Sequence, residues 1–233
     1  MKVNRYDRQI SLPEIGEEGQ EKLRRARVLI IGVGGLGSPI ALYLTSAGVG
    51  TLGLVDDDNV SISNLQRQVL YAEADVEQPK AECAARRLQA LNSEVEIHTY
   101  PFRLDKENVN ALITDYDIIV DGCDNFATRY LVSDACAILG KPYIYGAIQG
   151  FEGQVSVFCH PADFKTYRDL YPDEEETLRM PSPDKSVMGV TPAIVGSVEA
   201  SEVLKLISGY GELLAGKLWT IDLRTMQSYI LLI

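Results

Sequence analysis

The chain has 233 residues, of which 46% are hydrophobic and 24% are charged, and these values exclude a disordered or collagen-like chain. Its 22 basic and 33 acidic residues give a net charge of −11, so we expect no nucleic-acid partner and no membrane partner. No apolar run approaches the roughly 18 to 20 residues of a membrane-spanning helix. No apolar signal opens the chain and the 4 cysteines form no CxxC pair, so we expect a cytoplasmic protein.

Strand and helix patterns alternate along the first two thirds of the chain. The apolar residues 27–31 predict a buried strand, and a glycine-rich loop, a helix ending at Gly48 and a strand at 51–55 follow it. The alternation continues with strands at 95–100, 117–121 and 142–145 and with helices at 80–91 and 126–139. This pattern predicts an α/β fold with a Rossmann-like, mainly parallel sheet and helices on both faces.

The C-terminal part of the chain departs from this alternation. Residues 150–158 have the alternating character of a strand beyond the parallel core, and a helix at 191–208 precedes strands at 217–223 and 227–232. We expect these strands to extend the sheet in antiparallel fashion. The chain is interpreted as a single domain with an N-terminal arm at 1–26, a core at 27–147 and a C-terminal part at 148–233.

Residues 160–188, here called the crossing segment, contain four prolines, an acidic run at 173–176 and no periodicity. Long loops of this kind inside compact domains serve as lids, binding segments or mobile linkers. Two interpretations stay open, a functional segment that crosses the site and a disordered surface loop.

A glycine loop joins the first strand to its helix. Gly32, Gly34 and Gly37 match the pattern G-x-G-x-x-G, and the next strand ends at Asp56. Glycines let the backbone approach phosphate, the helix N-terminus supplies N–H donors, and an acid at this place accepts from ribose hydroxyls. The pattern therefore predicts a nucleotide site. A tight turn without a ligand is the alternative, and the loop alone does not distinguish an ATP enzyme from a dehydrogenase.

Amide and cationic side chains follow this unit. Asn64 and Arg67 stand three residues apart, a spacing that shares a helical face, and Lys80 follows a proline. An enzyme that cleaves between the α- and β-phosphates needs such cations, because negative charge accumulates on the departing pyrophosphate. A dehydrogenase does not cleave its coenzyme. The alternative for Arg67 and Lys80 is a pair of solvated surface charges.

The strand at 117–121 runs into Gly122-Cys123-Asp124-Asn125. Parallel sheets bind ligands at the carboxyl ends of their strands, so Asp124 is well placed to hold Mg²⁺, which prefers carboxylates together with phosphate oxygens. Asp124 as the N-cap of the following helix is the alternative. Cys123 has no adjacent histidine or lysine to lower its pKa, so we expect a buried residue and no nucleophile there.

Taken in order, these motifs resemble the ThiF/MoeB/HesA adenylyltransferases, which are relatives of the ubiquitin-activating enzymes, from residue 4 to about residue 230. The residues that carry the resemblance are Arg5-Tyr6-x-Arg8-Gln9, Gly32-x-Gly34-Gly35-Leu36-Gly37, Asp56-x-Asp58, Ser63-Asn64-Leu65-Gln66-Arg67-Gln68, Gln78-Pro79-Lys80 and Asp124-Asn125. The resemblance implies that MgATP activates the C-terminal glycine of a small ubiquitin-like sulfur carrier of the ThiS or MoaD kind. The products are an acyl adenylate and pyrophosphate.

The resemblance also implies roles for single residues. Asp56 would hold the ribose, Asp124 would manage magnesium, and Asn64, Arg67 and Lys80 would stabilise the phosphates. Arg8 would reach the γ-phosphate in the neighbouring subunit, which implies a homodimer with two shared sites. The full set of implied ATP-binding residues is Gly32, Gly34, Gly35, Leu36, Gly37, Asp56, Asp58, Ser63, Asn64, Leu65, Gln66, Arg67, Lys80, Asp124 and Asn125.

The chain departs from the family pattern in two places. Many members hold zinc through two CxxC pairs, whereas this chain has Thr166-Tyr167-Arg168-Asp169 in place of the first pair, so no zinc is expected. Some relatives carry a cysteine in the crossing segment that links covalently to the carrier. Here Ser182 stands near that place, and a serine hydroxyl is a poor substitute for a thiolate. We therefore expect adenylation by this chain and sulfur delivery by a separate donor.

The carrier would bind the strands and the crossing segment of the C-terminal part. The stretch from Gly146 to Gly153 is a candidate channel for its diglycine tail, and a core strand turn is the alternative for any one of these glycines. Two other function classes stay open. One is an NAD-dependent oxidoreductase, although His98 and His160 lie in no recognisable proton-transfer motif. The other is a non-catalytic nucleotide-binding interaction module.

Overall fold

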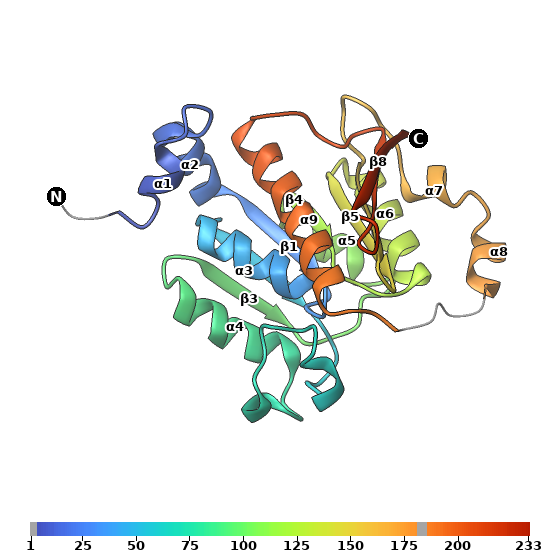
Figure 1. The fold of residues 1–233 in the computed structure, drawn as a ribbon, viewed down its shortest axis with the longest axis horizontal. Coiled ribbons are helices and arrows are strands. Elements are labelled where there is room, and N and C mark those ends of the chain that lie inside the picture. Colours follow the sequence, from blue (N-terminus) through green and yellow to red (C-terminus); the bar gives the residue numbers. More distant parts are fainter. Residues whose placement is uncertain (1–3, 181–185) are drawn as a thin grey trace.

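The computed structural model describes residues 4–180 and 186–233, and Figure 1 shows how their elements are arranged. One sheet runs through the domain in the strand order β3-β2-β1-β4-β5-β6-β7-β8. Its strands are β1 (Arg27–Ile31), β2 (Thr51–Val55), β3 (Glu96–Tyr100), β4 (Ile118–Asp121), β5 (Tyr143–Gln149), β6 (Glu152–Phe158), β7 (Lys217–Asp222) and β8 (Gln227–Leu232).

The sheet has a parallel part and an antiparallel part. Strands β3, β2, β1, β4 and β5 pair in parallel, and β6, β7 and β8 continue the sheet in antiparallel pairs. The predicted fold class is confirmed, including the antiparallel extension. From β1 the chain moves outward through β2 to β3 and then returns to β4 on the other side. This reversal makes the β1–β4 pair the switch point, where sheets of this kind bind ligands.

Helices pack on both faces of the sheet, as predicted (Figure 1). One face carries α2, α3, α4 and α9, and the other carries α5, α6 and α7 with α8 against α6. The α-helices are α1 (Asp7–Ile10), α2 (Gly16–Arg25), α3 (Gly37–Ala47), α4 (Lys80–Leu91), α5 (Val109–Thr114), α6 (Phe126–Leu139), α7 (Tyr167–Leu170), α8 (Glu174–Arg179) and α9 (Val190–Ser208).

The central strands are buried on both faces, which is why they read as continuous apolar runs in the sequence. In β1, Val28 and Ile30 belong to the core under α3 and α9, while Leu29 and Ile31 belong to the core under α5 and α6. The alternation of side chains along each strand therefore feeds two separate hydrophobic layers.

Several short helices were not predicted. In the N-terminal arm α2 begins with Glu17 and Glu18 and ends with basic residues, a charge pattern that suits the helix dipole and was an available signal. The crossing segment was expected to lack secondary structure, and this was wrong for α7 and α8. Helices of four and six residues are too short for a periodic pattern, and the acidic run is explained by Asp173, which caps α8.

In the ranges 4–180 and 186–233, no helix has the length and apolar character needed to cross a membrane.

Helices α3 and α9 approach each other closely at Gly196. A Cβ atom at this position would lie 2.6 Å from the carbonyl oxygen of Leu36 and 2.7 Å from Cγ of Pro39. We predict that Gly196→Ala lowers the free energy of unfolding by about 1 to 3 kcal/mol, because overpacking outweighs the better helix propensity of alanine. Urea unfolding followed by circular dichroism measures the change. The neighbouring variant Ser197→Ala should stay within about 0.5 kcal/mol of the wild type, and equal stability of the two variants would contradict the prediction.

Candidate functional site

The loops that follow β1 and β4 meet at the carboxyl edge of the sheet. Gly32 has a φ of +88°, and a Cβ atom on it would lie 2.7 Å from the carbonyl oxygen of Gly122. The reverse contact, from a Cβ atom on Gly122 to the carbonyl oxygen of Gly32, would be closer still. Glycine is required at both positions, because any larger residue would push the two loops apart. The glycine loop and the loop that carries Asp124 are thus held side by side.

Asp56 ties the end of β2 to the glycine loop. Its carboxylate accepts a hydrogen bond from the backbone N–H of Val33 at 2.9 Å and another from Asp58 at 3.0 Å. Burial raises the pKa of Asp56, and the nearby Lys80 and the two backbone donors oppose this rise. The first turn of α3 has no side-chain cap at Leu36. The N–H of Ser38 donates to the carbonyl oxygen of Gly34 at 3.0 Å and Pro39 has no N–H, so an anion here would be met by N–H groups of the glycine loop and not by a full helix turn.

Lys80 is a buried lysine at the start of α4. Its side chain is only 6% exposed, and its Nζ atom lies 2.7 Å from Oδ2 of Asp58, whose side chain is 70% exposed. Its backbone N–H also donates to the carbonyl oxygen of Asp58 at 3.0 Å. The interpretation of Lys80 as a solvated surface charge is therefore wrong. The structure brings this cation to the same edge of the sheet as Asp56.

The Ser63–Gln68 stretch packs against the glycine loop. A 3₁₀ helix covers only Ile62–Asn64, so the shared helical face expected for Asn64 and Arg67 is reduced to one short turn. Asn64 accepts a hydrogen bond from the backbone N–H of Ser61 at 3.3 Å, and Arg67 donates to the carbonyl oxygen of Ser63 at 3.2 Å. A Cβ atom on Gly35 would lie 3.6 Å from Cδ of Arg67. This contact brings Arg67 alongside the loop.

Gln68 was quoted in the sequence motif but was not predicted as a site residue. It is buried, and its amide nitrogen would lie 3.3 Å from a Cβ atom on Gly34. Its side-chain oxygen, Oε1, has no hydrogen-bond partner within the described ranges. A polar residue between Arg67 and an apolar stretch was the available signal for a side chain turned into the site.

Asn125, and not Asp124, caps the helix that follows β4. Its Oδ1 atom accepts a hydrogen bond from the backbone N–H of Thr128 at 2.9 Å, so the capping alternative for Asp124 is wrong. Asp124 is exposed at the carboxyl edge, two residues after Gly122. For Asn125 the helix cap is the role that the structure shows.

Cys123 is the adjacent residue on this loop. Its Sγ atom lies 2.8 Å from Oδ1 of Asp121, and burial together with this carboxylate raises the pKa of the thiol well above its usual value. The raised pKa disfavours the reactive thiolate, as expected from sequence, but the residue is partly exposed and not buried as predicted.

Acidic side chains at the carboxyl edge offer oxygen ligands for a metal ion. Among the residues that the structure describes, Asp56, Asp57 and Asp58 place their carboxylate oxygens within 4.8 Å of one another. Asp124 does not belong to this group. Carboxylate oxygens are the ligands that Mg²⁺ prefers, so both places have suitable chemistry for this ion.

Arg8 lies at the opposite edge of the sheet from the glycine loop. It belongs to α1, where Tyr6 packs under Gly48 and donates a hydrogen bond to Glu94 at 3.0 Å. Gly48 and Glu94 immediately precede β2 and β3, so α1 sits at the amino ends of the strands (Figure 1). Within one chain the structure does not bring Arg8 together with Arg67, Lys80 or Asp124.

The glycines at 146 and 153 serve the packing of α9. Gly146 lies in β5 against the carboxyl group of Glu199, and Gly153 lies in β6 against the side chain of Val195. At these two positions the structure supports the core-strand alternative and not the channel hypothesis. Gly150 differs from them, because it has a φ of +59° and forms the open turn between β5 and β6.

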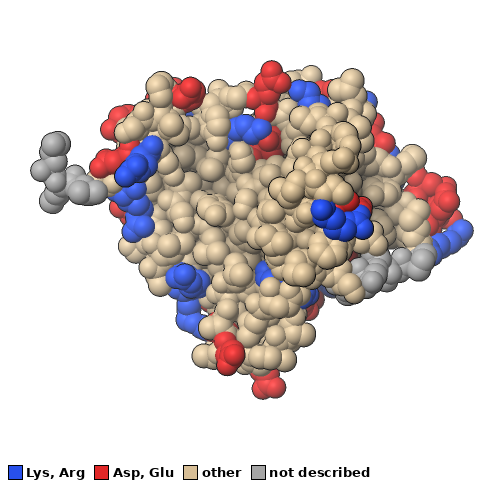
Figure 2. All heavy atoms as spheres, viewed as in Figure 1, with Lys and Arg blue, Asp and Glu red and all other residues tan. Residues whose placement is uncertain are grey.

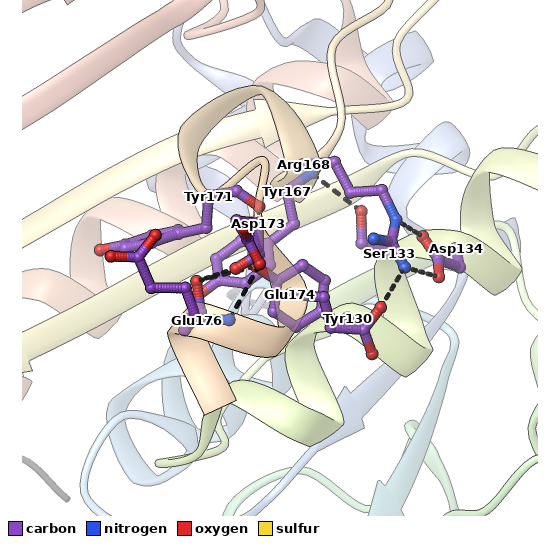
Figure 3. Close-up of polar contacts among 10 residues, drawn as sticks. Tyr130, Ser133, Asp134, Tyr167, Arg168, Tyr171, Asp173, Glu174 and Glu176 are labelled. Carbon is purple, nitrogen blue, oxygen red and sulfur yellow. Dashed lines mark hydrogen bonds and ion pairs between the residues drawn. The ribbon is translucent and has the colours of Figure 1, made fainter. Parts of the chain in front are cut away.

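The first half of the crossing segment is fastened to α6. Arg168 donates to both carboxylate oxygens of Asp134, at 2.9 and 2.7 Å, and to Glu174 at 2.8 Å (Figure 3). Thr166 and Asp169 form a hydrogen-bonded capping box around α7 at the place where relatives would carry a CxxC pair. Ser182, the residue compared with the family's cysteine, lies outside the described residues.

The end of the crossing segment returns to the site. Thr191 donates through Oγ1 to the carbonyl oxygen of Gly150 at 3.0 Å, and Gly189 lies against the carbonyl oxygen of Gln66. Pro192, in the first turn of α9, would contact a Cβ atom on Gly35 at 3.3 Å. The amino end of α9 therefore packs on the glycine loop, a contact that no sequence pattern indicated.

A buried acid lies beneath the carboxyl edge. Glu199 of α9 is fully buried, and neither of its carboxylate oxygens has a hydrogen-bond partner in the described ranges. Burial raises the pKa of Glu199 well above its usual value, Asp121 raises it further, and Arg129 lowers it. Burial without a hydrogen-bond partner among the described residues therefore favours the neutral form of this carboxyl group in the folded protein.

Together the glycine loop, the acid at the end of β2 and the neighbouring cations define an α/β nucleotide-binding domain. The chain belongs to the ThiF family, whose model matches residues 6–232. It is 50% identical over 225 residues to a sulfur carrier protein adenylyltransferase of Thermus thermophilus, covering 94% of this chain and 83% of that protein.

Other relatives are longer. The chain is 47% identical to the probable adenylyltransferase/sulfurtransferase MoeZ of Mycobacterium tuberculosis, matching 97% of this chain and 58% of MoeZ. Among solved structures, E. coli MccB with ATP aligns with a TM-score of 0.86 and 25% identity, covering 99% of this chain and 71% of MccB. PaaA aligns with a TM-score of 0.84 and 26% identity, covering 98% of this chain and 72% of PaaA.

The buried acid generates a prediction about pH. A carboxyl group whose pKa is raised by folding contributes stability that is fully present below its unfolded pKa and is lost as pH rises towards its folded pKa. We therefore predict that Glu199→Gln unfolds at a higher temperature than the wild type at pH 8 and that this advantage shrinks towards pH 4.5. Each unit of pKa shift corresponds to about 1.4 kcal/mol. Thermal unfolding between pH 4.5 and 8 measures the trend, and a variant less stable at every pH would contradict it.

Proposed function

We propose that this protein adenylates the C-terminal glycine of a ubiquitin-like sulfur carrier with ATP and releases pyrophosphate. The observation that carries the proposal is the buried Lys80, held beside Asp56 and Asp58 at the edge of a glycine-rich nucleotide loop that Arg67 also contacts. Cations so placed suit a nucleotide whose phosphates are cleaved. The Thermus thermophilus relative is named for the adenylation of a sulfur carrier protein, and the related fold of MccB has been solved with ATP.

In the proposed reaction a carboxylate oxygen of the carrier attacks the α-phosphorus of ATP. The new O–P bond forms as the bond from the α-phosphorus to the β-phosphate oxygen breaks, and pyrophosphate leaves. Two anions must approach each other, so Arg67, Lys80 and Asn64 would offset the charge on the phosphates. Asp56 would accept from the ribose, and N–H groups of the glycine loop would face the phosphates.

Magnesium fits the donor set of this edge. Asp124 and the Asp56–Asp58 group supply carboxylate oxygens, and Asp124 remains our proposed ligand because it is exposed on the loop beside the glycine loop. When bound, the ion would neutralise charge on the departing pyrophosphate. We also propose that this chain holds no zinc. Thr166 and Asp169 stand where the first CxxC pair would lie, and their side chains form a hydrogen bond to each other.

The oxidoreductase alternative finds no support in the positions of the histidines. His98 lies within β3 and bonds Glu96 at 2.8 Å, and His160 follows β6, whose antiparallel direction places it at the amino edge of the parallel strands. Neither histidine lies at the carboxyl edge beside the glycine loop.

We propose a homodimer because Arg8 and the site occupy opposite edges of the sheet. Only a second copy would bring this arginine to the phosphates. The face formed by α3 and α9 is largely neutral despite the net charge of −11, as Figure 2 shows, and its charged side chains gather at the margins. A groove of about 630 Å³ runs along α9, lined by Ile194, Val198 and Trp219 among others. A surface of this kind suits a contact between two copies.

The carrier would reach the site from the antiparallel end of the sheet. Strand β8 is the edge strand, and Tyr229, Ile230, Leu231 and Leu232 are each more than half exposed. An apolar edge strand offers unpaired backbone N–H and C=O groups and an exposed hydrophobic surface to another sheet. A relative in Porphyra purpurea is named a probable molybdopterin-synthase adenylyltransferase. We propose a MoaD-like or ThiS-like carrier, serving molybdopterin or thiamine synthesis, with sulfur supplied by a separate donor.

The test is ATP–pyrophosphate exchange in the presence of a carrier that ends in Gly-Gly, with magnesium. We expect exchange that depends on the carrier, and mass spectrometry of the carrier should show the added AMP. The same carrier without its last glycine is the control. Absence of exchange with all ThiS-like and MoaD-like carriers tried would reject the proposal, and saturable NADH binding in place of ATP binding would favour a dehydrogenase.

The buried cation generates the next prediction. Lys80→Ala should lower kcat for exchange by roughly 10²- to 10³-fold, the range seen when a single group that stabilises transition-state charge is removed. Initial rates of exchange at saturating ATP measure the loss. The matched control is Lys22→Ala, which removes an exposed lysine of α2 at the other edge of the sheet. Equal rates for the two variants would exclude Lys80 from catalysis.

Mixing two inactive variants tests the homodimer. Arg8→Ala removes an arginine from the partner's site, and Lys80→Ala removes a lysine from the chain's own site. A mixed dimer would then contain one intact site and one doubly altered site. After equal amounts are unfolded and refolded together, we expect about a quarter of the wild-type exchange rate, because about half of the dimers are mixed and each has one working site of two. Activity no higher than that of the separate variants would contradict a site shared between subunits.

A further inference from the structure

A buried ion pair holds the loop that carries Asp124. Arg129 of α6 is only 7% exposed, and its Nε atom lies 2.8 Å from Oδ2 of Asp121, which is fully buried at the end of β4. The other carboxylate oxygen of Asp121 accepts from the backbone N–H of Cys123 at 2.9 Å. The pair therefore joins the last residue of β4, the loop after it and the first turns of α6.

The guanidinium also reaches two backbone carbonyl groups. Its Nη2 atom donates to the carbonyl oxygen of Cys123 at 2.9 Å and to that of Gly146 at 3.1 Å. The first acceptor immediately precedes Asp124, and the second lies in β5. The planar fork of an arginine can make these bonds together with the ion pair, whereas a lysine amine cannot match that geometry.

Aromatic and acidic neighbours complete the cage around Arg129. Its guanidinium lies over the ring of Tyr145, with 5.4 Å between the Cζ atom and the ring centroid. On the opposite face of the sheet, Glu199 reaches the bare backbone of Gly146 but forms no bond to the guanidinium. Among these neighbours Asp121 is therefore the ion-pair partner of Arg129. Removing the carboxylate of Asp121 would leave the buried guanidinium without a partner.

We propose that Arg129 is a positioning residue that fixes the β4–α6 loop so that Asp124 faces a nucleotide-bound divalent cation. This proposal rests on one part of the proposed function, namely that the site binds a metal–ATP complex. Arg129 would touch neither substrate nor metal and would act through the backbone of Cys123, which immediately precedes Asp124, and through Gly146 of β5. Without the hydrogen bonds from Arg129 to Cys123 and Gly146, the β4–α6 loop would lose the contacts that fix the position of Asp124.

The test compares the binding of ATP with and without magnesium by isothermal titration calorimetry. We expect Arg129→Lys to weaken binding of MgATP by roughly 10- to 100-fold, the usual effect of removing a group that orients a metal ligand. Binding of metal-free ATP should change less than about twofold. Equal losses with and without magnesium, or no loss in either condition, would overturn the proposal.

Two further variants separate positioning from folding. The double variant Asp121→Asn with Arg129→Gln replaces the buried charges by a neutral pair, so it avoids an orphaned charge and should show the same selective loss for MgATP. The matched control is Lys141→Gln. Lys141 follows α6 and donates to the carbonyl oxygens of Thr114 and Tyr116 at 3.2 and 2.6 Å, at the opposite edge of the sheet. It should bind MgATP like the wild type, and a matching loss in this control would overturn the proposal.

Hydrogen exchange gives a readout that needs no nucleotide. In Arg129→Lys and in the double variant, amides between 122 and 128 should exchange faster than in the wild type, while those of β1 stay protected. Unchanged exchange of this loop would overturn the proposal. Failure of the proposed function looks different, because a wild-type protein that binds MgATP without carrier-dependent exchange would reject adenylation and leave these measurements interpretable.

Discussion

The site depends on the contact between the ends of β1 and β4, where two glycines face each other with no space for a side chain. This contact fixes the distance between the glycine loop and the loop that carries Asp124. Asp56, which bonds Val33 within the glycine loop, then fixes the end of β2 in the same frame. The groups that would meet the triphosphate are thus held by the sheet itself, which lowers the cost of ordering them when a nucleotide binds.

A protein of net charge −11 can bind a polyanion only through local charge, and the structure shows how the local balance is kept. Lys80 is buried, yet its partner Asp58 is largely exposed to water. Because water can solvate the carboxylate of Asp58, the amine can exchange this partner for a phosphate oxygen without leaving a buried carboxylate unpaired. The ion pair of Arg129 differs in burial, since the side chains of both Arg129 and Asp121 are buried. Such a pair suits a fixed anchor better than a group that moves during the reaction.

Sequence reasoning predicted the parallel core because the strands are buried on both faces and their apolar runs are unbroken. It also placed the glycine loop, Asp56 and Asp124 at one edge, since parallel strands share the direction of their carboxyl ends. It failed where contacts depend on distant parts of the chain. Arg129 reads as an ordinary polar position on α6, and Glu199 as one acid in an amphipathic helix. Their burial follows from packing on both sides of Gly146, which no local pattern encodes. The helices α7 and α8 were missed for another reason, their shortness.

Helix α9 connects these features, although its sequence suggests only an amphipathic helix. Its first turn places Pro192 on the glycine loop, its middle fits α3 through the missing side chain of Gly196, and the next turn places Glu199 beneath Gly146. The helix begins where the crossing segment ends, with Thr191 bonded to Gly150 in the turn between β5 and β6. Helix α9 therefore contacts both the turn between β5 and β6 and the glycine loop. The chain's two halves, nucleotide loop and antiparallel strands, are coupled by packing and not by a flexible linker.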